Sequence, residues 1–115
     1  MKDIEGKIQY KDKEYRLVFN LNVMEAIQEK YGTLENWGNL TDGQDGEPNA
    51  RAVIFGFTQM LNEGIDIANE ENGTADKPFT LKQVGRLITE VGLAKATQTL
   101  NKTVTDSTKS EEKNA

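Results

Sequence analysis

The spacing of apolar residues changes once along the chain, at Asn20, and this change limits the fold more than any other feature. Before it, residues 4–10 and 14–20 alternate between apolar and polar side chains, a period of two that predicts strands with one buried face. In the second strand Val18 falls on the polar side. The link Lys11-Asp12-Lys13 is short and polar, so the strands are expected to form a hairpin. A lone hairpin is marginal in water and needs helices over its apolar face.

After Asn20 the apolar residues recur at helical spacing. Asn20 or Asn22 is the expected N-cap of a first helix near residues 22–31, because either side chain accepts hydrogen bonds from the free backbone N–H groups. Asn22 and Glu25 resemble a capping box, and Gly32 is expected to end the helix.

Further helices are expected along the rest of the chain. Thr80 and Gln83 form a capping box before a stripe of residues expected to be buried, which starts at Leu81, and Gly92 ends that helix. Gly56 and Gly64 interrupt the longest candidate, and indicate either close helix packing or an earlier end. The expected segments are a short element from Thr33, a long helix at 50–71, a helix at 80–91 and a more polar one from Leu93 to Val104, with loops at 41–48 and 69–78.

These elements predict an α+β fold in which an N-terminal β-hairpin packs against a bundle of four to five α-helices in a single domain. The 115 residues suit one core. Residues 1–106 are assigned to this domain, and residues 107–115, almost without apolar side chains, to a flexible C-terminal tail.

Composition argues against enzymatic chemistry. The chain has no histidine and no cysteine, so it lacks imidazole acid–base groups, thiol nucleophiles and the common zinc ligands. No glycine-rich phosphate loop is present, and the acidic stretch 42–47 does not have the ligand spacing of a calcium loop. Four carboxylates have near-helical spacing but no partner nucleophile: Glu63, Asp66, Glu70 and Glu71. We therefore expect no enzyme activity, no cofactor and no metal site.

The charge distribution bears on partners. The net charge is −5, and residues 32–78 carry nine acidic groups against two basic ones. An acidic chain is a poor binder of nucleic acid phosphates, so no nucleic acid partner is expected. No apolar run approaches the ~18 residues of a membrane helix, and residues 1–10 lack the apolar core of a signal peptide. The protein is expected to remain where it is synthesised.

Four apolar residues are candidates for partner binding. Trp37, the only tryptophan, suits either a core position or an interaction anchor. Leu93, Leu100 and Val104 lie on a narrow stripe with Ala96, which suits either packing on the domain or a helix that faces a partner. Both readings stay open for all four residues.

Several of these patterns occur together in one known family. Within residues 15–22 a strand ends in Phe19-Asn20, and it leads into a helical segment, residues 24–32, of the type E-x-I-x-E-x-Y-G. Later, residues 79–88 form a helix of the type T-x-x-x-V-x-x-L-I that ends at Gly92. Over about residues 10–105 the chain resembles the small tail assembly chaperones of long-tailed (siphovirus-type) bacteriophages and prophages.

This resemblance implies a non-enzymatic role. Such chaperones bind the tape measure protein, a long helical apolar chain, and help to recruit tail tube subunits. They act in the cytoplasm of the bacterial host and are expected to be absent from mature virions. The alternative is a structural component of the phage tail or head–tail connector, although such proteins are usually richer in strands. An acidic mimic of nucleic acid is a third reading, which 14 interspersed basic residues make a poor fit.

Overall fold

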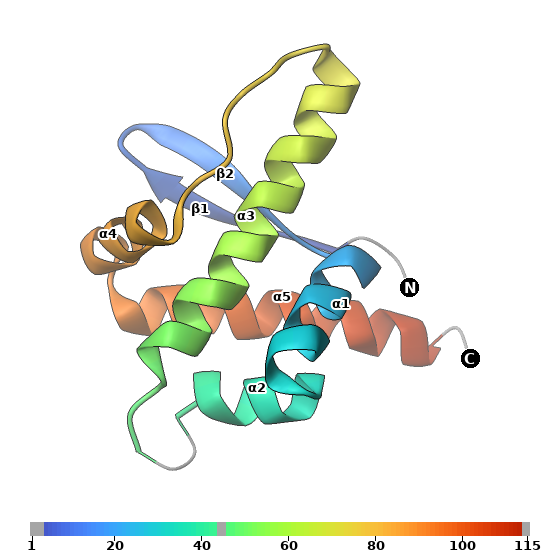
Figure 1. The fold of residues 1–115 in the computed structure, drawn as a ribbon, viewed down its shortest axis with the longest axis vertical. Helices are drawn as coiled ribbons and strands as arrows, with labels where there is room; N and C mark the ends of the chain where they lie inside the picture. Colours follow the sequence, from blue (N-terminus) through green and yellow to red (C-terminus); the bar gives the residue numbers. More distant parts are fainter. Residues whose placement is uncertain (1–3, 44–45, 114–115) are drawn as a thin grey trace.

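The hairpin packs against five helices, as the change of period at Asn20 predicts (Figure 1). The computed structural model describes residues 4–43 and 46–113. The expected α+β class, with a hairpin against a bundle of four to five helices, is confirmed. The elements are β1 Ile4–Tyr10, β2 Lys13–Phe19, α1 Leu21–Tyr31, α2 Leu34–Thr41, α3 Ala50–Asn72, α4 Leu81–Val91 and α5 Leu93–Lys113.

The strands β1 and β2 are antiparallel and are joined by a two-residue turn. Tyr10 pairs with Lys13, so the second strand begins inside the link that the sequence left between the strands. Lys11 and Asp12 both have positive φ, 50° and 62°. Two left-handed residues in succession are the geometry of a type I′ turn, whose twist matches that of the flanking strands.

The hairpin is covered by helices on both sides near the end of β2. α3 packs along β2, whereas α5 packs mainly against β1 (Figure 1). Leu17, Val18 and Phe19 are consecutive and all fully buried. The assignment of Val18 to an outward polar face was therefore wrong, because period-two reasoning assumes that one face of the strand is solvated.

Side chains cap the starts of α1 and α4. The expected capping box of Asn22 and Glu25 was wrong, because Asn20 is the N-cap and Asn22 lies inside α1. Asn20 is the cap of α1 and accepts from the Val23 N–H at 3.3 Å. At α4 the capping box is complete: the Thr80 hydroxyl accepts from the Gln83 N–H at 3.1 Å, and the Gln83 side chain accepts from the Thr80 N–H at 2.9 Å. Each cap satisfies N–H groups that the helix itself leaves free.

One core connects the hairpin to all five helices. Its buried members are Ile8, Leu17, Phe19, Val23, Ile27, Trp37, Ala52, Val53, Phe57, Met60, Leu61, Val84, Leu87, Ile88, Ala96 and Leu100. None of the helices in the described ranges is both long enough and apolar enough to cross a membrane.

The last helix continues beyond the expected end of the domain. α5 extends to Lys113, and Ser107, which the sequence assigned to a flexible tail, is fully buried. Small side chains let α5 approach the hairpin closely: a Cβ atom at Gly6 of β1 would overlap the Thr103 hydroxyl. Thr103 is buried too, and its hydroxyl donates to the Thr99 carbonyl at 2.8 Å. The helix therefore buries hydroxyl side chains that a search for apolar residues passes over.

Candidate functional site

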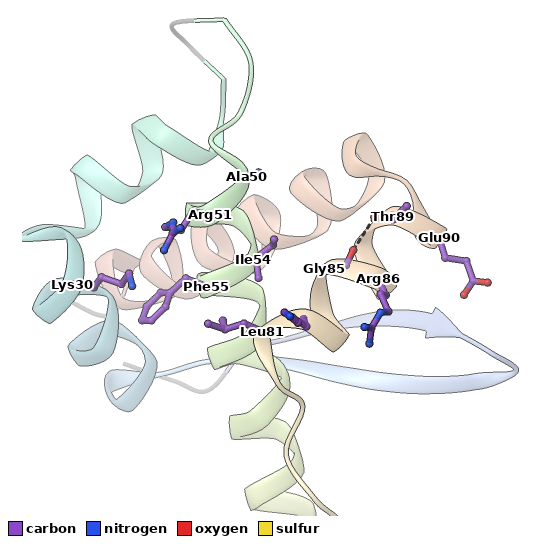
Figure 2. Close-up of a pocket in the computed structure, with 11 residues that line it drawn as sticks. Lys30, Ala50, Arg51, Ile54, Phe55, Leu81, Gly85, Arg86, Thr89 and Glu90 are labelled. Atoms are coloured by element: carbon purple, nitrogen blue, oxygen red, sulfur yellow. Dashed lines mark hydrogen bonds between the residues drawn. The ribbon is translucent and has the colours of Figure 1, made fainter.

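A groove of about 930 Å³ crosses the outer face of α3, between the end of α1 and the length of α4 (Figure 2). Its floor is apolar and consists of Ile54 and Phe55 from α3 with Leu81 and Gly85 from α4. Ile54 and Phe55 are half-buried, whereas Leu81 is 52% exposed. We call this surface, with the charged residues described below, the α3 groove.

Hydrogen bonds fix the position of Leu81 on the groove. The Asn62 side chain of α3 forms two hydrogen bonds with the backbone of Phe79. It donates to the Phe79 carbonyl at 3.0 Å and accepts from the Phe79 N–H at 2.8 Å. The capping box at Thr80 then starts α4 one residue later. Leu81 is the first residue of that helix, so it lies before the turn whose side chains reach the core. The exposure of Leu81 thus follows from an ordered backbone.

Gly85 has no side chain and so leaves space on the α4 side of the groove floor. It sits in the middle of α4, one turn after Leu81. A Cβ atom there would meet the Ile54 Cδ1 atom at 3.6 Å, an ordinary van der Waals distance, so the absence of a side chain is not required by packing. Its absence leaves Ile54 accessible from the groove.

Basic side chains surround this apolar floor. Lys30 of α1 and Arg51 of α3 lie on one side of α3, and Arg86 of α4 lies on the other (Figure 2). Lys82 adds a fourth cation one turn before Arg86, and Glu90 is the one acidic residue that lines the groove. All four cations are exposed. Within the described residues none of them forms an ion pair, so their charge is available to a ligand.

Aromatic residues support the α1 side of the groove. The rings of Tyr31 and Phe55 meet edge to face with centroids 5.8 Å apart, and the Lys30 Nζ atom lies 5.0 Å from the Phe55 ring centre. The Tyr31 hydroxyl is buried and has no hydrogen-bond partner among the described residues. Burial raises the pKa of Tyr31 above 10.0, and the nearby Arg51 charge offsets part of this rise.

The four residues that the sequence proposed for partner binding do not form one surface. Trp37 and Leu100 are buried in the core, 1% and 0% exposed, and the Trp37 indole N–H donates to the Ala52 carbonyl at 2.9 Å. Of the two roles expected for them, core packing or partner binding, these two residues therefore have the core role in this fold. Val104 is half-buried against the core, and Leu93, 45% exposed, is the only accessible member of the set.

Sequence reasoning missed the residues that line the groove. It placed Leu81 in the buried stripe of its helix, and this was wrong, because the stripe enters the core only from Val84 onward. One signal was available: Lys82 and Arg86 stand four residues apart on the helix that begins with Leu81, so cations and an apolar residue share one region. Nothing in the sequence indicated that α1 and α3 would adjoin it.

Two of the four acidic residues of α3 have structural partners. Glu63 accepts from the side-chain amides of Asn20 and Asn22 at 2.6 and 3.0 Å, and Glu71 pairs with Arg16 at 3.3 Å. No three Asp or Glu residues in the described ranges are close enough together to hold a metal ion. The arrangement on the α3 groove, with apolar floor and basic rim, is suited to binding.

Comparisons with protein-family models, with curated proteins and with solved structures found no match for this chain.

Proposed function

We propose that this protein is a non-enzymatic tail assembly chaperone of a long-tailed bacteriophage or prophage. It binds the tape measure protein in the cytoplasm of the bacterial host, helps to recruit tail tube subunits, and is left out of the mature virion. The likeness of residues 10–105 to this family supports the proposal, because the caps and apolar positions quoted for it belong to β2, α1 and α4 of one fold.

The observation that carries the proposal is the α3 groove. A chaperone of a long apolar helical protein needs an accessible apolar surface on a carrier that itself does not aggregate. The groove offers Ile54, Phe55 and Leu81 to a ligand, while the net charge of −5 keeps the carrier molecules apart. Recognition of a helix by an apolar groove is a common mode of protein binding.

Co-expression tests this function. The tape measure protein encoded near this gene is expected to stay soluble when the two proteins are made together and to co-purify with a tagged copy of this chain. Recovery of none, under conditions where both proteins are soluble, would contradict the proposal. Virions purified from the same phage are expected to lack the protein. If the protein is instead abundant in the virions, it is a structural component of the tail or head–tail connector, which is the alternative given in the sequence analysis.

A further inference from the structure

The charge on the α3 groove identifies the kind of segment that binds there. We infer that the groove takes an amphipathic α-helix whose apolar side chains cover the floor and whose flanking positions are acidic. This inference rests on the proposed function and specifies the part of the partner that is recognised.

The floor requires apolar side chains from the ligand. Leu81 is 52% exposed although it lies in an ordered helix turn fixed by Thr80 and Gln83. Covering exposed apolar area of this kind with a partner is favourable, because the area is removed from water. At about 930 Å³ the groove is larger than a site for one side chain, and it extends across α3 from Lys30 of α1 to Glu90 near the end of α4. It therefore suits a row of side chains, such as those at positions i, i+3 or i+4 and i+7 of a helix.

The rim requires negative charge on the ligand. Lys30 and Arg51 stand on one side of the floor and Lys82 and Arg86 on the other, against a single carboxylate, Glu90. The chain as a whole is at −5, so the groove reverses the sign of the surrounding protein. Cations on both sides of an apolar floor complement a helix that carries Asp or Glu on both flanks of its apolar stripe.

The second groove of the molecule does not have this charge pattern. It has a volume of about 300 Å³ and lies between β2, the second half of α3 and residues 76–79. Lys13, Arg16 and Lys77 line it together with Glu14 and Asp76, so cations exceed carboxylates there by one, and Arg16 is already paired with Glu71. The α3 groove, with four cations against Glu90, has an excess of three and is the more basic of these two surfaces.

Nucleic acid is a poorer occupant than an acidic helix. A phosphate backbone is bound by cations that follow the strand, with aromatic faces for stacking where the strand is single. Here the accessible centre of the groove is aliphatic, at Leu81 and Ile54, and these side chains have no hydrogen-bond donor or charge for a phosphate. Phe55, the one aromatic ring that lines the groove, already contacts Tyr31 and Lys30.

A pair of designed peptides tests the inference. The first is a helical peptide of about 20 residues with Leu at the apolar stripe and Glu on both flanks; the second has the same stripe with Lys in place of every Glu. Fluorescence anisotropy of labelled peptides against the full chain is expected to show that the acidic peptide binds at least about tenfold more tightly. Its affinity is expected to fall as salt rises from about 0.05 M to 0.3 M, because exposed charges are screened.

Charge reversal on the protein locates the site. Lys82→Glu with Arg86→Glu is expected to weaken the acidic peptide by about tenfold or more. The matched control is Lys77→Glu with Lys95→Glu, which changes the net charge equally, uses exposed residues outside the α3 groove, and is expected to change affinity less than about twofold. Far-UV circular dichroism and a thermal midpoint establish that both variants fold. Equal weakening by both variants, or equal binding of both peptides, would overturn the inference.

Further outcomes separate the inference from the function it rests on. Tighter binding of a single-stranded DNA oligonucleotide than of the acidic peptide would assign the groove to nucleic acid and overturn the inference. If Lys82→Glu with Arg86→Glu leaves capture of the tape measure protein intact, the groove assignment fails and the chaperone function stands. If the acidic peptide binds at the groove but the tape measure protein is never captured, the inference holds and the function fails.

Discussion

The indole of Trp37 lies directly against the Cα atom of Gly56, so that α2 and α3 are in contact at this point. A Cβ atom at Gly56 would overlap the ring. The indole N–H reaches the Ala52 carbonyl, one turn earlier on α3, at 2.9 Å. The glycine and the hydrogen bond together hold the only tryptophan close against α3.

Gly56→Ala is therefore expected to destabilise the protein by about 1–3 kcal/mol, the usual cost of overpacking a core. This loss exceeds the gain of about 1 kcal/mol that alanine brings to the interior of a helix. Urea unfolding followed by tryptophan fluorescence gives the free energy of unfolding and reports on the ring itself.

Gly85→Ala is the matched control, because Gly85 is also inside a helix but has only Ile54 Cδ1 nearby, at 3.6 Å. It is expected to stabilise the protein by up to about 1 kcal/mol. A gain in stability for both variants would show that α2 and α3 are not in tight contact at Trp37.

Truncation of two core residues tests the packing of the hairpin on the helices. Phe19 ends β2 and Leu87 lies in α4, and both are fully buried. Phe19→Ala and Leu87→Ala are each expected to cost about 2–5 kcal/mol of unfolding free energy. Leu21→Ala, at a residue 65% exposed, is expected to change stability by less than about 0.5 kcal/mol. If the midpoint is unmoved by both core changes, this core is wrong.

The Tyr31 hydroxyl is buried with no hydrogen-bond partner in the part of the chain that the structure describes, so removing it is expected to cost nothing. Tyr31→Phe keeps the ring contact with Phe55 and deletes only the unpaired oxygen. At neutral pH the variant is expected to be as stable as the native chain or slightly more stable, because an unsatisfied buried polar group is lost. A clear loss of stability would mean that the hydroxyl has a hydrogen-bond partner in solution.

The same variant gives a pH test with a definite sign. Burial raises the pKa of Tyr31 in the folded state above 10.0, so the folded chain holds this proton more tightly than the unfolded chain. Its stability is therefore intact below about pH 10 and falls as the pH rises through the folded-state pKa. Native protein is expected to lose stability relative to Tyr31→Phe in this alkaline range. Parallel curves for the two proteins would contradict the raised pKa.

Burial of Ser107 makes the end of the folded unit measurable. A chain that ends at Asp106 loses this residue, whose hydroxyl lies 3.5 Å from the Phe19 carbonyl, whereas a chain that ends at Thr108 keeps it. The shorter chain is expected to be less stable than the longer one by about 1 kcal/mol. Identical thermal midpoints would restore the boundary at residue 106 that the sequence predicted.

Local signals made most of the fold predictable. The alternation before Asn20 and the capping pairs act over a few residues, so the sequence alone locates the strands and the start of α4. The contact at Gly56 was one of two readings of an interrupted helix, and the close approach of Trp37 decides between them.

The candidate site was not predictable, because it depends on which elements become neighbours. Leu81 belongs to the same helical stripe as Val84, and only the position of α4 against α3 leaves the first exposed and the second buried. Trp37 and Leu93 show the same limit. Trp37, whose residue type is more typical of an interaction anchor, is in the core, whereas Leu93 is at the surface. Composition reports a side chain's chemistry and not its neighbours.

The close approach of β1 and α5 joins the two ends of the described chain. Gly6 lies against Thr103, and Ile8 shares the core with Leu100. During synthesis β1 leaves the ribosome first, and α5 is the last of the described elements to be made and to emerge. Until α5 emerges, the face of β1 that α5 covers in the folded protein is without its helix. Completion of the core is therefore an event that follows, and does not accompany, synthesis of the preceding helices.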